Sequence, residues 1–580
     1  MPAKIYTSPD PSVPIVSRSV FTHLLAKDGG LVGDHPANLP AFVDSASGTT
    51  ITRAQLRSLA LSLGYALQNH PRIGAKRGDT VLVYSPNSLA WPVAVFGSIS
   101  AGLRTTFANN AYTSRELAHQ YTDSRASYVF TTEEGLPTVR EMFKTIGVGS
   151  EGDKKILLFS NSLSWAGGPD APRSPHTAGL LRIDDLLSLG QLKEEEKFEG
   201  DLAQETVFLC YSSGTTGKPK GVETKHQNLT SVVDMTNLGL SYIAGEPILG
   251  VLPFYHIYGA VKLLLFPLKC GSPCIIQPRF DPVQFCANIE RYKIKLALIV
   301  PPIMVVFARH PAVEQYDLTS LKVLISGAAP LGAALTKQVN DRLRARKVNC
   351  AIVQGYGLTE TSPTTHLLPP QDAERKMGST GTLLANLEAR LVDEGVDAAE
   401  GQPGELWIRG PTIMKGYLNN VEATKEAITP DGWFMTGDVA VRDKDGFYFI
   451  VDRRKELIKY KLNNASKVPP AELESVLLSH PDIADAAVVG VYDAEEATEL
   501  PRAYVVHAKP PKISTDIEKH AFTRDISSWI QTKVARHKFL RGGVVVIDVV
   551  PKSAAGKILR RELRDRAKAE VGKEPAKTKL

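Results

Sequence analysis

The sequence predicts an α/β protein with a large N-terminal multi-subdomain region, built on largely parallel sheets, and a small C-terminal α+β domain. The chain has 580 residues, which is more than a single packed core accommodates. β-rich runs alternate with helical patterns, and this alternation is typical of parallel sheets. After residues 447–461 the strand and helix patterns become shorter. We therefore expect domains at 1–451 and 452–580.

Strand–turn–helix units recur along the N-terminal region. Residues 79–102 run from a β-rich stretch through a Ser-Pro-Asn turn into a helical pattern, and residues 321–345 repeat that order. Residues 350–357 supply a further strand. Ligands usually bind beyond the carboxyl ends of such strands. Residues 148–205, which include the charge run KEEEKFE, are expected to form an excursion on the surface.

Composition indicates an ordinary globular protein, with 43% hydrophobic and 22% charged residues. A net charge of +6 is too dilute over this length to predict a nucleic-acid partner. The longest apolar runs, such as 296–308, are short and interrupted by proline, so we expect no membrane span. Five cysteines without paired spacing predict neither a disulfide framework nor a zinc site. The sequence leaves the oligomeric state open.

Both ends of the chain bear on its location. The start has no signal-peptide pattern, so we expect an intracellular protein. The last three residues, TKL, differ in one position from the peroxisomal address SKL. A cytoplasmic and a peroxisomal location both remain open.

The strongest local pattern is YSSGTTGKPKGV at 211–222. Glycines let backbone N–H groups turn toward an anion, hydroxyls donate further hydrogen bonds, and lysines neutralise phosphate charge. The loop is not a Walker A motif, because Pro219 stands where that motif has a magnesium-binding hydroxyl. We expect a helix after the loop, capped by Asn228. The nucleotide-binding candidates are Ser212, Ser213, Gly214, Thr215, Thr216, Gly217, Lys218 and Lys220.

This loop resembles the signature of the adenylate-forming superfamily, which includes acyl-CoA synthetases and 4-coumarate:CoA ligases. Further segments resemble family motifs in the family's order, over nearly the whole chain. They are LPFYHIYG (252–259), QGYGLTET (354–361), GELWIRGPTIMKGYL (404–418), GWFMTGD (432–438), DRRKELIKYK (452–461) and PKSAAGKILRREL (551–563). The resemblance implies an ATP-dependent acid:CoA ligase that forms an acyl-AMP from a small carboxylic acid. It also implies ATP, Mg²⁺ and coenzyme A as cofactors.

The resemblance assigns the nucleotide contacts. Thr359 would reach a phosphate oxygen, and Glu360 would bind Mg²⁺, for which a carboxylate is a usual ligand. Asp438 would accept hydrogen bonds from the ribose hydroxyls, with Arg453 nearby. Taken alone, a Thr-Glu pair is typical of a helix start and Asp438 of a turn. The floor under the adenine would be Gly355, Tyr356 and Gly357.

In the family the small domain is mobile and rotates between the two half-reactions. The resemblance places the hinge at Asp452. Lys557 would bridge the carboxylate and the α-phosphate in the first state, and Lys459 would act in thioester formation. His256 would be the gate to the acyl pocket. Without the resemblance, Lys557 is typical of a solvated helix end and His256 of a core histidine.

The acid cannot be chosen from the sequence. Nonribosomal adenylation domains hold the substrate amine with an aspartate before the gate, and LPFYHIYG has no acidic residue, so an α-amino acid is disfavoured. An aryl acid, a phenylpropanoid-like acid and a medium-chain fatty acid remain open. The substrate-binding candidates by position are Tyr255, His256, Tyr258, Gly259, Phe307, Gly327 and Thr364.

One segment departs from the family pattern. Where members read lysine, glycine, any residue, glutamine and valine, this chain reads KLNNASKV at 461–468, with Leu462 in the glycine position. In the family this loop lies beside the pantetheine channel. The departure leaves open an adenylating enzyme with a non-CoA acceptor, or an oxygenase of the luciferase type. A non-catalytic nucleotide-binding relative is a third possibility.

Overall fold

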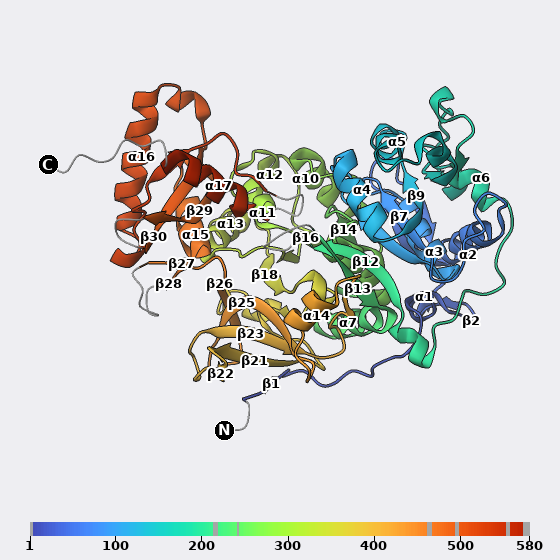
Figure 1. Ribbon diagram of the computed structural model, residues 1–580, viewed down its shortest axis with the longest axis horizontal. Coiled ribbons are helices and arrows are strands. Elements are labelled where there is room, and N and C mark those ends of the chain that lie inside the picture. The colour runs from blue at the N-terminus through green and yellow to red at the C-terminus, as the bar shows by residue number, and fades with distance from the viewer. Residues whose placement is uncertain are drawn as a thin grey trace.

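Three large sheets and a smaller C-terminal unit make up the computed structural model (Figure 1). It describes residues 4–212, 219–240, 243–460, 467–493, 498–552 and 557–571. Parallel strands dominate two of the large sheets, as the alternating pattern predicts. Within these ranges no helix combines the length and the apolar character needed to cross a membrane.

The first sheet has eight strands, and all pairs from β11 to β12 in its order are parallel. β12 and β13 form an antiparallel hairpin that pairs Ser212 with Lys220, the two ends of the predicted phosphate loop. In spatial order the strands are β11 (Leu181–Arg182), β10 (Ile156–Leu158), β9 (Ala126–Thr131), β7 (Thr80–Tyr84), β8 (Arg104–Ala108), β12 (Thr206–Ser212), β13 (Lys220–Lys225) and β24 (Gly416–Tyr417).

The second sheet has nine strands, and its middle strands are parallel. Its order is β20 (Thr382–Leu383), β19 (His366–Leu367), β18 (Ala351–Tyr356), β17 (Val323–Ser326), β16 (Leu296–Ile299), β14 (Ile248–Gly250), β15 (Cys274–Ile276), β5 (Pro40–Asp44) and β6 (Thr50–Thr52). The apolar run at 296–308 divides between β16 and a helix that begins at Pro301, where proline is well tolerated.

The third sheet is antiparallel and consists of β1 (Tyr6–Thr7), β21 (Glu388–Asp393), β22 (Val396–Asp397), β23 (Gly404–Arg409), β25 (Phe434–Arg442) and β26 (Tyr448–Arg453). Three small strands lie outside these sheets and pair with one another: β2 (Lys27–Asp28), β3 (Leu31–Val32) and β4 (His35–Pro36).

Helices pack between and around the sheets of the large region. Every residue of α3 is buried, which explains why its sequence is apolar on all sides. The helices are α1 (Val20–Leu25), α2 (Arg53–Asn69), α3 (Ala90–Ser100), α4 (Ser114–Asp123), α5 (Leu136–Thr145), α6 (Ile183–Leu187), α7 (His226–Gly239), α8 (Ile257–Gly259), α9 (Phe266–Cys270), α10 (Pro282–Tyr292), α11 (Pro301–Arg309), α12 (Ala312–Gln315), α13 (Ala333–Ala345) and α14 (Val421–Ala427).

Two details of the large region differ from the sequence-based expectations. A strand, β13, separates the phosphate loop from α7, and Lys225 rather than Asn228 occupies the cap position. The Asn228 side chain lies in the first turn, where it accepts a hydrogen bond from the Lys225 N–H and donates two to the carbonyls of Pro411 and Ile413.

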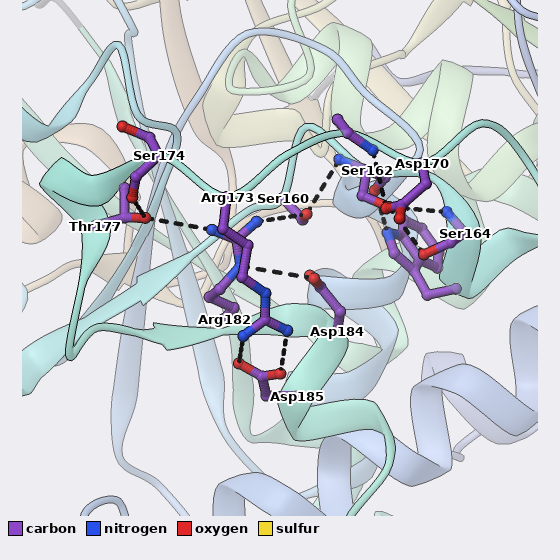
Figure 2. Close-up of polar contacts among 12 residues, drawn as sticks. Ser160, Ser162, Ser164, Asp170, Arg173, Ser174, Thr177, Arg182, Asp184 and Asp185 are labelled. Atoms are coloured by element: carbon purple, nitrogen blue, oxygen red, sulfur yellow. Dashed lines mark hydrogen bonds and ion pairs between the residues drawn. The ribbon is translucent and has the colours of Figure 1, made fainter.

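The second difference concerns residues 148–205, which are not simply a surface excursion. β10 and β11 join the edge of the eight-stranded sheet, because the Ile-Leu-Leu run at 156–158 is fully buried there. Figure 2 shows the polar contacts that organise the loops around them. The buried Arg182 donates to Ser160 (2.8 Å) and Thr177 (3.3 Å), while Arg173 pairs with Asp185 (2.6 Å).

The C-terminal unit has a hydrophobic core of its own, which begins at Ile458. It contains the sheet β29 (Ile483–Asp493), β30 (Thr498–His507) and β31 (Val544–Val546) and the pair β27 (Ile458–Lys459) and β28 (Lys467–Val468). Its helices are α15 (Pro470–Leu478), α16 (Asp516–Gln531) and α17 (Arg560–Val571). The proline-led start of α15 agrees with the sequence pattern. The domain boundary at 451/452 stays a prediction.

Candidate active site

Most of the predicted site residues line one cavity of about 960 Å³. The eight-stranded and the nine-stranded sheets both contribute residues to its wall. The C-terminal unit contributes Lys459 and Lys557. Residues 213–218, which hold the predicted Ser213, Gly214, Thr215, Thr216, Gly217 and Lys218, lie outside the described residues. The predicted residues found in the wall are Ser212, Lys220, Tyr255, His256, Tyr258, Gly327, Gly355, Tyr356, Gly357, Thr359, Glu360, Thr364, Arg453, Lys459 and Lys557.

Glu360 is held in place from two sides. It lies in a short 3-10 helix, Thr359–Thr361, directly beyond the end of β18. One of its carboxylate oxygens accepts hydrogen bonds from the Ser212 hydroxyl (3.1 Å) and the Tyr417 hydroxyl (2.9 Å). The Lys220 ammonium lies 4.8 Å from the centre of the Tyr417 ring. A carboxylate and a cation therefore flank the loop end where a triphosphate is expected.

The donor set at this end fits magnesium. Mg²⁺ is usually bound by one or two carboxylates together with substrate phosphates and water, rather than by a cage of protein ligands. Glu360 is such a carboxylate, and it is 8% exposed in the cavity wall. The Tyr417 and Ser212 hydroxyls orient the Glu360 carboxylate by hydrogen bonds, as neighbouring residues commonly orient the ligands of a metal ion.

Asp438 is buried next to Tyr356 and is not among the residues that line the cavity. Its carboxylate accepts a 2.6 Å hydrogen bond from the Tyr356 hydroxyl, and the Arg453 guanidinium lies 3.4 Å away. The antiparallel register of β25 and β26 places Asp438 directly opposite Arg453. Burial raises the pKa of Asp438, while Arg453 and the Tyr356 hydrogen bond act in the opposite direction.

Lys557 lies within electrostatic reach of the phosphate and ribose candidates. Burial, and next the Arg453 charge, lower the pKa of Lys557 to about 8, while Asp438 and Glu360 oppose that change. Burial, and next the Lys557 charge, lower the pKa of His256 to about 4, so this ring is neutral at pH 7. Its Nδ1 accepts the Tyr258 N–H at 3.2 Å. The C-terminal unit therefore presents its lysine to the cavity beside the predicted gate.

The acyl-binding candidates divide into two groups. Tyr255, Tyr258, Gly327 and Thr364 line the cavity. The Tyr258 hydroxyl donates to the Ile325 carbonyl at 3.3 Å, and a Cβ on Gly327 would meet this ring at 3.0 Å. Glycine at 327 therefore makes room for the tyrosine ring.

Phe307 and Gly259 do not line this cavity. Phe307 is 1% exposed and packs edge-on against Phe285, with ring centres 5.8 Å apart. A Cβ on Gly259 would lie 2.1 Å from the Pro253 carbonyl oxygen, so this glycine serves the close packing of α8. Position in the motif order does not separate such core residues from pocket residues.

Asp452 joins the large region to the C-terminal unit. Its buried carboxylate accepts hydrogen bonds from the Arg453 N–H (2.7 Å) and from the Ala471 N–H (2.9 Å) at the start of α15. Lys459 is exposed, and its N–H donates to the Glu499 carboxylate at 2.8 Å. The hinge and thioester roles of these residues stay predictions. The altered loop, residues 461–466, lies outside the described residues.

Sequence reasoning missed several residues of the cavity wall, and two of them, Tyr417 and Lys262, bear on its chemistry. Tyr417 stands inside a family-like segment, but its partner Glu360 is 57 positions away. Lys262 has a signal that could have identified it. It is the one charged residue between Ala260 and Leu268, and an unbroken apolar stretch otherwise predicts a buried helix.

Comparisons with known proteins show the family to which the chain belongs. A family model described as AMP-binding enzyme matches residues 32–418, and one described as AMP-binding enzyme C-terminal domain matches residues 472–557. 4-Coumarate-CoA ligase 1 of Narcissus pseudonarcissus is 36% identical over 541 residues, covering 92% of this chain and 91% of the relative. 4-Coumarate--CoA ligase 2 of Oryza sativa subsp. japonica is 38% identical over 542 residues, covering 90% and 89%.

The fold has solved counterparts. A crystal structure of an anthranilate CoA ligase in complex with anthranoyl-AMP superimposes with a TM-score of 0.79 at 23% identity, covering 97% of this chain and 99% of that one. This likeness confirms the predicted fold class.

Proposed function

Because the chain belongs to the AMP-binding enzyme family, we propose that it is an ATP-dependent acid:CoA ligase that forms AMP. It activates a carboxylic acid as an acyl-AMP and then transfers the acyl group to coenzyme A. The observation that carries this function is that Glu360, Lys220 and Lys557 line the same cavity as the aromatic candidates for acyl binding. ATP, Mg²⁺, coenzyme A and the acid are the small molecules it uses.

In the first half-reaction the substrate carboxylate attacks the α-phosphorus of ATP and pyrophosphate leaves. Like-charged groups must approach one another, so fixed cations and dipoles lower the barrier more than an acid or base would. Lys557 bridges the carboxylate and the α-phosphate, and Thr359 and Lys220 contact the phosphates. Glu360 would hold Mg²⁺, which would supply further positive charge at the triphosphate. Asp438 and Arg453 orient the ribose, and Tyr356 contacts the adenine.

In the second half-reaction the thiolate of coenzyme A attacks the acyl carbonyl and AMP leaves. Lys557 and the pantetheine thiol cannot occupy the same place, so the C-terminal domain rotates about Asp452 between the two steps. Lys459 then acts in thioester formation, and His256 opens the path of the thiol. The neutral state of His256 suits a gate, because a neutral ring rotates without moving a buried charge.

The substrate is an aryl acid, a phenylpropanoid-like acid or a medium-chain fatty acid. The names of the relatives add 4-coumarate to the acids that should be tried first. Tyr255, Tyr258 and Thr364 offer aromatic faces and hydroxyls for any of these.

A panel of aryl, phenylpropanoid and fatty acids, assayed for AMP release with and without coenzyme A, tests the function. We expect sustained AMP release that requires both an acid and coenzyme A.

The second candidate is an adenylating enzyme with a non-CoA acceptor, which the altered 461–468 segment favours. It predicts acid-dependent ATP–pyrophosphate exchange without any thioester. Bound ATP with no exchange for any acid would contradict both and favour a non-catalytic relative.

We expect the protein in the cytoplasm or in peroxisomes. The terminal TKL supports the peroxisome through its likeness to SKL, and these residues lie outside the described part of the chain. Microscopy of the chain fused at its N-terminus to a fluorescent protein, with and without TKL, distinguishes the two locations.

A further inference from the structure

Lys262 is a buried lysine in the wall of the cavity. It is 4% exposed, and its neighbours from Ala260 to Leu268 are buried hydrophobic residues. Its ammonium donates a hydrogen bond to the hydroxyl of Thr236 on α7, and Thr236 lines the same cavity. Leu240, directly after α7, and Tyr258, Leu298 and Ile325, on α8, β16 and β17, also contribute to the wall. The lysine therefore belongs to the apolar, acyl-binding part of the cavity.

The described residues give this ammonium no counter-ion, although the centre of the Phe266 ring lies 5.9 Å from it. Among the residues that the structure describes, no carboxylate forms an ion pair with it, and Thr236 alone accepts a hydrogen bond from its three donors. A buried charge without a counter-ion is costly. Burial lowers the pKa of Lys262 to about 7.

Lys269, on the adjoining α9, shows the usual alternative. It is flanked by the carboxylates of Asp34 and Asp234, each 3.1 Å away, which raise its pKa. The fold can thus provide counter-ions for a lysine on this stretch of helix, and the described residues provide none for Lys262.

The backbone around Lys262 is unusual. Residues Ala260–Leu265 form a π-helical segment between α8 and α9. Such segments are rare and occur frequently at functional sites. A π-helical turn displaces the side chains that follow from the positions of a regular α-helix, so the local geometry is suited to the placement of particular side chains rather than to packing alone.

We propose that Lys262 determines substrate specificity by binding a second carboxylate at the far end of the acid, so that the preferred substrates are dicarboxylic acids. This inference rests on the proposed function, because it names the acid class of the same cavity. The distal carboxylate supplies the counter-ion and the hydrogen-bond acceptors that the described part of the chain does not. One lysine, Lys557, then serves the reacting carboxylate, and Lys262 serves the other end.

Matched pairs of acids test the proposal: octanoate with octanedioate, and cinnamate with 4-carboxycinnamate. 4-Hydroxycinnamate tests whether a neutral polar group suffices. For wild type, Lys262→Met and Lys262→Arg, kcat/KM is measured from AMP release with ATP and coenzyme A. The binding of each acid is measured separately by calorimetry without ATP. Lys337→Met is the matched control, because Lys337 lies on the exposed side of α13, with its side chain 69% exposed.

We expect the wild type to prefer the dicarboxylic member of each pair. In Lys262→Met the ratio of kcat/KM for diacid over monoacid should fall about 30-fold or more, as loss of a buried charge pair predicts. Lys262→Arg should retain part of the preference and Lys337→Met all of it. A circular-dichroism spectrum and a thermal unfolding midpoint close to those of wild type show that Lys262→Met is folded.

Two outcomes separate this inference from the proposed function. If monoacids are activated and the ratio is the same in wild type and Lys262→Met, or if wild type favours the monoacid in every pair, the inference is overturned and the ligase function stands. If calorimetry shows a diacid preference that Lys262→Met abolishes, but no acid supports AMP release, the inference stands and the ligase function fails. Equal binding of both members of each pair also overturns the inference.

Discussion

The Tyr417 hydroxyl donates a 2.9 Å hydrogen bond to the carboxylate of Glu360, in the wall of the proposed active site. Tyr417 comes from β24 at the edge of the eight-stranded sheet, and Glu360 follows β18 of the nine-stranded sheet. The bond therefore orients the proposed magnesium ligand across the junction of two sheets. Ser212 supports the same oxygen from the end of the phosphate loop.

Tyr417→Phe should weaken adenylation. A hydrogen bond to a charged group contributes about 1.5–3 kcal/mol, so we expect a loss of about 10-fold or more in kcat/KM for MgATP. The loss should become smaller as Mg²⁺ is raised, because a higher metal concentration compensates for a weakened metal site by mass action. The ring and its contact with Lys220 remain in this variant. Tyr492→Phe, at a side chain exposed to 65%, is the control. A loss independent of Mg²⁺ would contradict the orienting role.

Tyr356→Phe should shift the pH dependence of nucleotide binding. Burial raises the pKa of Asp438, so its ionised form is lost at a higher pH than that of an exposed aspartate as the pH falls. The Tyr356 hydrogen bond lowers this pKa, and removal of the hydroxyl should raise it further. The acid limb of kcat/KM for ATP should therefore move to higher pH. An unchanged limb, with Asp438→Asn also unchanged, would argue against ribose binding by Asp438.

Lys557→Ala should abolish most of the first half-reaction. The variant removes a cation that lies within electrostatic reach of Glu360 and Asp438. Because this cation would stabilise the charge that develops at the α-phosphate, we expect acid-dependent ATP–pyrophosphate exchange to fall by about 100-fold. Thioester formation from a synthetic acyl-AMP should remain. The proposed role would be wrong if AMP release were unchanged for every active acid.

Lys459→Ala should have the opposite pattern. Lys459 is exposed at the cavity wall, so its replacement should not disturb the fold. We expect thioester formation from synthetic acyl-AMP to decrease while pyrophosphate exchange continues at the wild-type rate. Equal damage to both half-reactions would count against this division of roles.

Arg309→Ala should shift the C-terminal domain away from the adenylating arrangement. Arg309, on α11, donates to the carbonyls of Ile483 (2.6 Å), Leu478 (3.1 Å) and His480 (3.4 Å) in the C-terminal unit. These bonds accompany the arrangement in which Lys557 lines the cavity. Pyrophosphate exchange should fall several-fold, with thioester formation from acyl-AMP retained.

Arg344→Ala provides the comparison for Arg309→Ala. Arg344 pairs with Glu374 at the surface of the large region, and its side chain is 53% exposed. Its replacement should leave both half-reactions unchanged. A parallel decrease of both half-reactions in Arg309→Ala would show that Arg309 supports stability and not domain orientation.

Local patterns in the sequence predicted the elements of the fold and the class of chemistry. The β-rich run, turn and helical pattern at 79–102 became β7 and α3, and the pattern at 321–345 became β17 and α13. The resemblance of ordered motifs, with the Gly-Thr-Lys loop first, predicted the family that the comparisons show. Such signals are local because glycine, proline and side-chain periodicity act on the backbone within a few residues.

Only the tertiary structure decided which side chains meet. The Tyr356–Asp438 pair spans 82 positions, and the Lys262–Thr236 pair joins two helices. Phe307 was expected in the pocket and lies in the core, while Lys262 was not expected and lies in the cavity wall. The partners of a buried polar group depend on how separate sheets and helices pack, and no pattern within one element carries that information.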